Sequence, residues 1–364
     1  MRVGIVSISN IKHMTLISLY TDILKKNKID YDFIYVDKYN ISEKNDADNI
    51  FKYVISIKKN SSSLKKAIKY AGFIRFAKKI IRDNNYDLLI VWGSGTGYIL
   101  SRFLVNRWKE KYIYNIRDYG YENKKIISIL QNKIVKNSLF TTISSKKFLD
   151  FLPSSSKYIF VNSINPKLTE ELLSSNSSKI TSKAIRICFI GYVRFIENDK
   201  KLLLALKNDS RFIVQYFGAK SDILKKFAEE NGIKNTEFID SFDSSQTSEL
   251  LMKADVINNL YGNDDTALDT AISIKYYYSI LLNLPILVWK NTYMEEITKD
   301  FPGVFVFDGN YNGLNDRLYT WYSQINKKRM IERNSKLVKD FRKENTFFEN
   351  KFADLFREAR EEKS

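Results

Sequence analysis

Residues 254–288 read ADVINNLYGNDDTALDTAISIKYYYSILLNLPILV. A β-prone run at 256–260 is stopped by a Gly-Asn-Asp-Asp turn. Ser273 is a plausible N-cap for a helix, and Pro285 breaks the helical pattern before a second buried strand at 286–288. The pattern therefore predicts a strand, a loop, a helix and a strand, which is the repeating unit of a parallel α/β sheet.

The predicted helix begins at the carboxyl edge of the strand before it. Free backbone N–H groups and the positive end of the helix dipole favour a phosphate at such a place. Lys275 in the first turn adds a mobile cation, and Ser273 lies beside it. An ordinary βαβ unit with a surface lysine explains these residues equally well, so both interpretations stay open.

The same residues resemble a segment of GT-B glycosyltransferases in which a lysine precedes a strand-starting proline by ten positions. Lys275 and Pro285 keep that spacing. The resemblance implies two Rossmann-like domains and a nucleotide-diphosphate sugar donor, with Ser273, Lys275, Tyr276 and Tyr278 around that donor. Tyr278 stands where the family usually has a glutamate that binds the donor's ribose, which leaves recognition of the ribose by a carboxylate open.

Length and composition favour a two-domain cytoplasmic protein. The 364 residues are enough for two domains of roughly 150–200 residues, and 44% of them are hydrophobic. The single cysteine, Cys188, excludes a disulfide framework and suits a reducing compartment. No uninterrupted apolar run approaches a membrane span, and the N-terminus enters a strand at once, so we expect neither a spanning helix nor a signal peptide.

The formal net charge of +17 is concentrated in the first half of the chain. Residues 1–150 contain 28 Lys and Arg against 13 Asp and Glu, a balance of +15, whereas residues 151–364 contain 31 against 29, a balance of +2. Ten Lys and Arg lie between Asp48 and Asp83 with no acidic residue among them. Positive charge also suits nucleic acid, but no recognised binding module accompanies it, and we expect no nucleic-acid partner.

Residues 64–82 of this basic region can form a helix with Phe73 and Phe76 among its cations. Its expected apolar stripe is Leu64, Ile68, Ala71, Ile74, Ala77 and Ile81. Such helices can lie at a membrane interface, so we expect an anionic membrane surface to be contacted from Lys58 to Arg82. A packed helix with a solvated basic face is the alternative.

Strand-like runs alternate with helical patterns along the chain, which predicts parallel sheets covered on both faces. The expected strands are 3–8, 31–36, 86–92, 111–116, 140–143 and 158–161, then 185–190, 212–217, 237–239, 256–260, 286–288 and 304–307. Residues 165–183, rich in Ser, Asn and Lys, are expected to link the two series.

The expected fold class is α/β of the GT-B type, with two Rossmann-like parallel-sheet domains facing a cleft. We expect residues 1–166 to form an N-terminal, acceptor-binding and membrane-facing domain. Residues 184–335 should form the domain that binds the nucleotide sugar. By resemblance to similar enzymes, residues 336–364 should be a helix that crosses back to the first domain.

The segment GYVR, which starts at Gly191 and ends at Arg194, resembles a GT-B loop in which an arginine and a later lysine hold the donor diphosphate. The resemblance implies Gly191, Arg194 and Lys200 or Lys201 as donor ligands, with Gly218 as a second turn near the base. A guanidinium can bind two phosphate oxygens and offset charge on the leaving group. A helix cap or an ion pair is the structural alternative for Arg194.

Three features point to the acceptor side. Asp118, in the segment 117–120, resembles the position of a family acid/base pair, although a turn aspartate capping a helix explains it as well. His13, the single histidine, can reach the cleft but is more often structural. The glycine-rich run 93–97 lacks the acidic partner of a dinucleotide loop and is expected to shape the cleft.

These residues together predict a GT-B glycosyltransferase of the bacterial capsular or surface polysaccharide type, with Asp118, Arg194 and Lys275 as catalytic candidates. The resemblance implies a glycan or polyprenyl-linked acceptor at the inner face of the cell membrane. The resemblance to the family favours a retaining outcome, but no residue of this sequence determines it. A catalytically silent GT-B-like subunit that binds a partner transferase is the alternative, and a homo-oligomer is left open.

Metal chemistry is not expected. Two Asp-x-Asp sequences, at 30–32 and 46–48, lie too early in the chain for the metal site of GT-A transferases. The sequence has no Cys/His cluster of metal-ligand spacing. We therefore expect no metal and no cofactor, the nucleotide sugar being a substrate.

Overall fold

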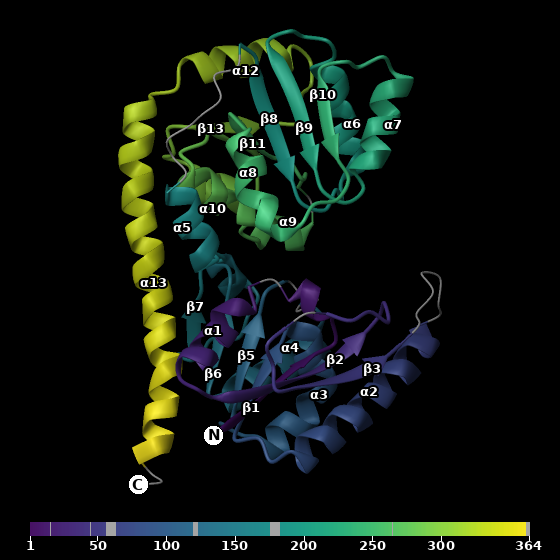
Figure 1. The fold of residues 1–364 in the computed structure, drawn as a ribbon, viewed down its shortest axis with the longest axis vertical. Helices are drawn as coiled ribbons and strands as arrows, with labels where there is room; N and C mark the ends of the chain where they lie inside the picture. Colours follow the sequence, from purple (N-terminus) through teal and green to yellow (C-terminus); the bar gives the residue numbers. More distant parts are fainter. Residues whose placement is uncertain are drawn as a thin grey trace. The chain divides into compact units, whose positions relative to one another are not determined.

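The computed structural model describes residues 1–14, 16–43, 45–55, 63–118, 123–174, 183–263 and 265–361. The chain divides into two compact units, Met1–Asn162 with Lys343–Ser364 and Ser163–Arg342. Each unit is a parallel sheet with helices on both faces (Figure 1). The predicted fold class, two Rossmann-like α/β domains, is therefore confirmed.

The sheet of the first unit has seven strands in the order β3-β2-β1-β4-β5-β6-β7. They are β1 (Arg2–Ser7), β2 (Asp30–Asp37), β3 (Asn49–Val54), β4 (Leu88–Trp92), β5 (Tyr112–Ile116), β6 (Phe140–Ile143) and β7 (Tyr158–Phe160). The edge strand β3 was not predicted. Its side chains are exposed or half-buried, and Lys52 interrupts the apolar residues of its sequence, NIFKYV.

Successive residues of the central strands point into opposite cores. Val3 and Ile5 of β1 pack on the side of α1 (Ser18–Lys26) and the end of α13 (Lys327–Glu361), whereas Val6 packs on the side of α2 (Ser63–Asp83), α3 (Ser94–Arg107) and α4 (Lys125–Asn137). The helices of this unit are η1 (Ile11–His13), α1 (Ser18–Lys26), α2 (Ser63–Asp83), α3 (Ser94–Arg107), α4 (Lys125–Asn137) and η2 (Lys146–Asp150). Burial on both faces explains the continuous apolar runs in the strand sequences.

The second unit has a six-stranded sheet in the order β10-β9-β8-β11-β12-β13. Its strands are β8 (Ile185–Ile190), β9 (Phe212–Phe217), β10 (Thr236–Ile239), β11 (Val256–Asn259), β12 (Ile286–Trp289) and β13 (Val304–Phe307). Each was predicted to within two residues. Parallel pairing brings the carboxyl ends of β8, β9 and β11 to one edge, where ligands of such sheets bind.

The helices of the second unit are α5 (Pro166–Ser174), α6 (Ile196–Ala205), α7 (Ser221–Glu230), η3 (Ser244–Gln246), α8 (Thr247–Met252), α9 (Thr266–Thr270), α10 (Ile274–Leu281), α11 (Tyr293–Thr298), α12 (Leu314–Ser323) and the first part of α13 (Lys327–Glu361). Two of them, α5 and α9, were not predicted. Helix α5 lies inside the expected linker. Its Leu172 is fully buried, and a buried side chain makes this part of the polar-looking segment structured.

The last helix, α13, contributes to a core in each unit. Met330 and Phe341 pack in a core of the second unit. Phe348, Phe352 and Phe356 are buried in a core of the first unit. The first unit is thus built from both ends of the chain.

Helix α2 covers its sheet with part of the expected stripe, Ile74, Ala77 and Ile81, together with Phe73, which was not on it. Phe73, Ala77 and Ile81 are buried, whereas Ile68 is 63% exposed. Several stripes of helical period can be drawn through this apolar-rich segment. Tyr53 of β3 decides between them, because its ring lies 6.0 Å from that of Phe73. Phe73, outside the expected stripe, is therefore buried beside β3.

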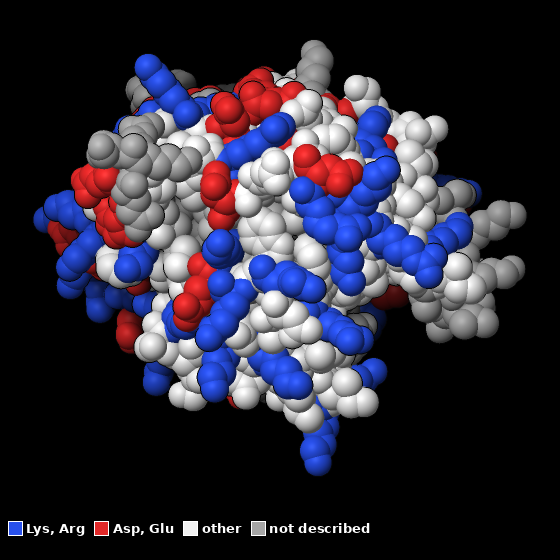
Figure 2. Space-filling view, turned by 90° about the horizontal axis from the view of Figure 1, so that it is seen from below, with Lys and Arg blue, Asp and Glu red and all other residues white. Residues whose placement is uncertain are grey.

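Charge on the side of the molecule that carries α2 and α3 is mainly positive. Lys and Arg side chains spread over much of this side, with Asp and Glu in smaller patches (Figure 2). No helix in the described part of the chain is both long and apolar enough to cross a bilayer. Residues 58–62 of the expected membrane-contacting segment, and the side chains of 63–67, lie outside the described residues.

Candidate functional site

Gly191 follows β8 and Gly218 follows β9, and the two glycines cross in close contact at the carboxyl edge of the sheet. Gly191 and Gly218 have φ angles of +120° and +133°, which L side chains rarely adopt. The Gly191 N–H donates to the carbonyl oxygen of Phe217 at 2.8 Å. A Cβ on Gly218 would lie 2.1 Å from the carbonyl oxygen of Gly191, so no other residue fits there. The two glycines predicted for the donor site thus form one close backbone crossing.

Helix α10 begins beside this crossing. The Ser273 hydroxyl oxygen accepts a hydrogen bond from the Lys275 backbone N–H at 3.3 Å, which confirms the predicted N-cap. The Lys275 ammonium nitrogen lies 4.0 Å from the position that a Cβ on Gly191 would take. Ser273, Lys275, Gly191 and Gly218 therefore meet at one edge of the second sheet.

Lys275 is a buried cation, 2% exposed. Its ammonium nitrogen lies 4.1 Å from the ring centroid of Phe189 and 4.6 Å from that of Tyr261, and it donates to the Tyr261 hydroxyl. In the described part of the chain it forms no ion pair. An ammonium group buried without a carboxylate in ion-pair contact is costly unless an anion completes its surroundings. The arrangement suits a bound phosphate.

Arg194 lies in the exposed loop between β8 and α6. Its guanidinium carbon is 5.9 Å from the ring centroid of Tyr192, and the Lys220 ammonium nitrogen is 4.8 Å from the same centroid. Among the residues that the structure describes, neither cation forms an ion pair. The sequence analysis missed Lys220, although it follows the Gly218 turn by two residues. Two cations flanking Tyr192 thus extend the positive edge that Lys275 begins.

Of the other predicted donor ligands, Lys200 and Tyr276 have other partners, whereas Tyr278 interacts electrostatically with Tyr261, which contacts Lys275. The Lys200 ammonium nitrogen is 2.9 Å from a carboxylate oxygen of Glu197, in an ion pair along α6. Tyr276 is buried in the core against Phe341, with ring centroids 6.0 Å apart. Tyr278 is largely buried, and burial raises its pKa to about 12. The spacing along α10 places Tyr276 toward the core because one face of the helix must cover the sheet.

Asp199 of α6 is a buried carboxyl group that the sequence analysis did not single out. It is 3% exposed, and it accepts a hydrogen bond from the Tyr216 hydroxyl at 2.9 Å. Burial raises the pKa of Asp199 to about 7, while the Tyr216 hydrogen bond and the positive charge of Lys275 act in the opposite direction. A group that changes charge near neutral pH therefore interacts electrostatically with Lys275.

The first unit has a cavity of about 220 Å³ at the carboxyl edge of its sheet. Its lining comes from the ends of β1, β4 and β5 and the start of α3: Ile8, Ser9, His13, Trp92, Gly93, Ser94, Gly95, Thr96, Arg117 and Asp118. Three features singled out in the sequence, His13, the glycine-rich run and Asp118, therefore line the same cavity. The sequence analysis had not named Arg117, which contributes a guanidinium to the lining.

Local hydrogen bonds shape this cavity. The Ser94 hydroxyl donates to the backbone carbonyl of Asp118 at 3.3 Å, and the Thr96 hydroxyl donates to that of Trp92 at 2.6 Å. His13 lies in the short turn η1, and its Nε2 is 3.0 Å from the Tyr39 hydroxyl. The exposed carboxylate of Asp118 can act on a hydroxyl that enters the cavity.

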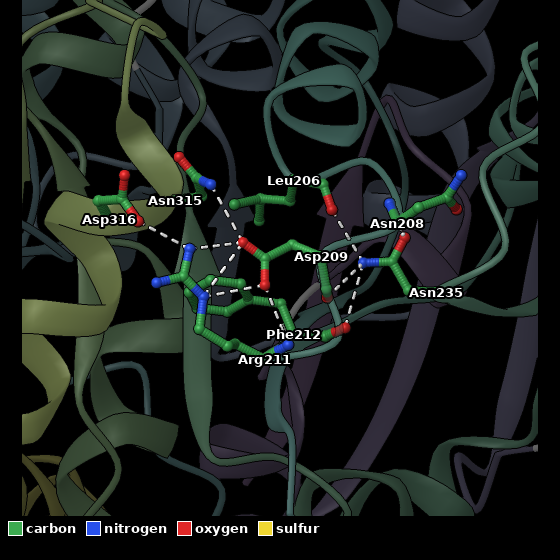
Figure 3. A network of polar contacts seen from close by, with 8 residues as sticks. All are labelled: Leu206, Asn208, Asp209, Arg211, Phe212, Asn235, Asn315 and Asp316. Atoms are coloured by element: carbon green, nitrogen blue, oxygen red, sulfur yellow. Dashed lines mark hydrogen bonds and ion pairs between the residues drawn. The ribbon is translucent and has the colours of Figure 1, made fainter.

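A third polar cluster, at the amino end of β9, is structural. Asp209, Arg211, Asn315 and Asp316 bond one another, and Asn235 donates to three backbone carbonyls (Figure 3). The Arg211 guanidinium lowers the pKa of Asp209. The acidic, basic and amide groups therefore satisfy one another. Among the described residues, no three His, Cys, Asp or Glu side chains are grouped as a metal site requires.

Two Rossmann-like domains, each with ligand-binding features at the carboxyl edge of its sheet, define the GT-B class of fold. Sucrose-phosphate synthase from Thermosynechococcus elongatus is similar with a TM-score of 0.70 and 8% identity, over 100% of this chain and 98% of that one. HepE from Anabaena, solved with UDP, is similar with a TM-score of 0.63 and 11% identity, over 98% and 100%. It has also been solved with UDP-glucose.

WaaG, a glycosyltransferase involved in lipopolysaccharide biosynthesis, is similar with a TM-score of 0.60 and 13% identity, over 97% of this chain and 99% of that one. No family model and no curated protein matches the sequence. At these identities the similarity establishes the fold, and the argument for function depends on the residues.

Proposed function

We propose that the protein is a glycosyltransferase that moves a sugar from a nucleotide-diphosphate donor to a glycan or polyprenyl-linked acceptor. The observation that carries this proposal is the buried Lys275, which has no ion-pair partner in the described part of the chain and lies beside the Gly191 and Gly218 crossing. Such a site is complementary to a diphosphate. Similar structures that bind UDP or UDP-glucose support this choice of anion.

Each residue has a role in this reaction. The bond between the sugar's anomeric carbon and the diphosphate oxygen breaks, and a bond from that carbon to an acceptor hydroxyl oxygen forms. Lys275, Arg194 and the N-terminus of α10 offset the negative charge on the departing diphosphate. The two glycines let the backbone approach the phosphates because they carry no side chain. Asp118 orients the acceptor hydroxyl or receives its proton.

The acceptor and the cellular setting extend this proposal. We infer that the acceptor is a surface glycan, carried on a polyprenyl lipid at the inner face of the cell membrane, in capsular or other surface polysaccharide synthesis. The positive first half of the chain supports a membrane-facing role, since anionic lipids attract Lys and Arg. The diphosphate is held by protein cations, so no metal is required.

A product assay tests the proposal. The purified protein is incubated with a panel of nucleotide sugars and a polyprenyl-linked acceptor, and the products are identified by mass spectrometry. We expect one donor to yield an acceptor heavier by one sugar residue together with the free nucleoside diphosphate. An acceptor left unchanged by every donor, with no nucleoside diphosphate bound, would contradict the proposal.

A catalytically silent subunit is the second candidate. The observation that favours it is Tyr278, which stands where similar enzymes carry a ribose-binding glutamate and whose pKa is raised to about 12 by burial. Such a subunit would bind a nucleoside diphosphate or a partner transferase without turnover. Binding measured by calorimetry, combined with no product in the same assay, would distinguish it from an active enzyme.

A further inference from the structure

A groove of about 700 Å³ lies between α2 and α3 in the first unit. Its lining is Arg75, Lys78, Ile81, Arg82, Asn85, Tyr86, Phe103, Arg107 and Trp108. Tyr86 and Trp108 come just before β4 and β5, so the groove lies at the amino edge of the sheet. The cavity lined by Asp118 lies at the carboxyl edge, which makes the groove separate from the proposed acceptor site.

The groove gathers four cations and no acid. Arg75, Lys78 and Arg82 are spaced by three and four residues, which places them on one face of α2. Arg107 faces them from the end of α3. Within the described residues none of the four forms an ion pair. Like charges facing one concavity repel, so an anion bound between them is favoured.

Aromatic side chains form the rest of the binding surface. The Lys78 ammonium nitrogen lies 5.6 Å from the ring centroid of Phe103, and Phe103 and Trp108 are half-buried. The Nε of Arg82 donates to the backbone carbonyl of Lys78 at 3.2 Å, which limits the freedom of that guanidinium. Aromatic rings next to Lys and Arg are characteristic of the headgroup region of membranes, where one end of the ring is apolar and the other is wet.

We propose that this groove binds the phosphate headgroup of one anionic phospholipid, with Trp108 and Phe103 beside the glycerol and the first methylene groups of its chains. The site gives the proposed membrane-facing role a specific position in the fold, and to that extent it rests on the proposed function. Binding itself requires no donor sugar and no turnover. Basic residues around the groove attract an anionic membrane to the whole surface without a specific contact. The four cations that line the groove contact one phosphate.

Matched charge reversals on one helix separate the two effects. The variant Arg75→Glu/Arg82→Glu changes the groove, and Lys69→Glu/Lys79→Glu changes α2 by the same charge outside the groove lining. Partitioning is measured by sedimentation with vesicles of phosphatidylglycerol and of phosphatidylcholine. We expect the groove variant to lose at least about tenfold more binding to phosphatidylglycerol than the control variant, with wild-type binding to phosphatidylcholine weak. Equal losses in the two variants would overturn the proposal.

A fluorescence measurement locates the lipid. Brominated phosphatidylglycerol should quench Trp108, and the Trp108→Phe variant should lose most of that quenching while it still binds the vesicles. Inorganic phosphate and a short oligonucleotide serve as competing probes. Millimolar phosphate should compete with the vesicles, because it occupies the same cations. Tighter binding of the oligonucleotide than of phosphatidylglycerol, with the same dependence on Arg75 and Arg82, would refute a lipid site.

The outcome is independent of the transferase proposal. Groove variants should retain transfer to a short soluble acceptor, because the groove contains none of the proposed site residues and lies at the opposite edge of its sheet from Asp118. Loss of vesicle binding with retained transfer supports the lipid site. Absence of transfer in every variant, with groove-dependent binding intact, would contradict the enzymatic function and leave the lipid site standing.

Discussion

Replacing Lys275 by methionine tests the diphosphate site most directly. Methionine keeps an unbranched chain between the rings of Phe189 and Tyr261 and removes the charge together with the hydrogen bond to the Tyr261 hydroxyl. A contact between a buried cation and a phosphate oxygen contributes on the order of 2–4 kcal/mol to binding or to transition-state stabilisation. We therefore expect kcat/KM to fall by roughly 30- to 1000-fold, and the affinity for UDP or another nucleoside diphosphate to fall by a similar factor.

The stability of the same variant supplies the control. Removing an unpaired buried ammonium relieves its desolvation cost, so the unfolding midpoint of Lys275→Met should stay the same or rise. Lys226→Met removes a largely exposed charge from α7 and should change neither activity nor nucleotide binding. Titration calorimetry and differential scanning calorimetry measure both quantities. Unchanged nucleotide affinity in a folded Lys275→Met protein would refute the argument that the buried ammonium holds the diphosphate.

Arg194→Ala should lower kcat/KM by roughly 30- to 1000-fold without loss of fold, and EDTA should leave wild-type turnover unchanged; restoration of an EDTA-treated enzyme by Mg²⁺ would show that the site was misread. Nucleoside diphosphate affinity should fall about fivefold or more as the pH rises from 6 to 8, because Asp199, with its pKa raised to about 7, gains negative charge near Lys275. Because the pKa of Asp199 in the folded protein is higher than its unfolded value of about 4, the free energy of unfolding should also decrease as the pH rises from about 4 to 7. Asp199→Asn should flatten the pH dependence of both nucleotide affinity and stability. Asp209→Asn should lower the unfolding midpoint at pH 7, and the difference from the wild type should shrink below about pH 4, because the lowered pKa of Asp209 stabilises the fold only while the carboxylate is ionised. Gly218→Ala should destabilise the second unit, as calorimetry would show, because its Cβ would meet the Gly191 carbonyl.

Strands that are buried on both faces were predictable from the sequence. The central runs, such as residues 185–190 and 212–217, are continuously apolar, and the structure has strands at those positions. The edge strand β3 was not predicted, although most of its residues, NIFKYV, are apolar, because Lys52 interrupts the run. Phe73 of α2 packs beside that strand, and its burial was missed with it.

The candidate site was predictable where backbone geometry determines the residue. Ser273, as an N-cap, and Gly191 and Gly218, as turns of positive φ, have local causes that a sequence displays. Asp199 had no such signal: an acidic residue in the first turn of a helix reads as solvated, and its burial results from Tyr216 on another element. Lys220 joins the site only because β9 lies beside β8.

The two-ended construction of the first unit has a consequence for biosynthesis. Residues 1–162 leave the ribosome first, yet Phe348, Phe352 and Phe356, which fill one of their cores, are translated last. The second unit is contiguous in sequence and can fold while one apolar face of the amino-terminal sheet is covered only in part, by α1. The nascent chain therefore carries an incomplete domain through most of its synthesis. The apolar surface that Phe348, Phe352 and Phe356 later cover is a natural place for a chaperone to bind or for aggregation to begin.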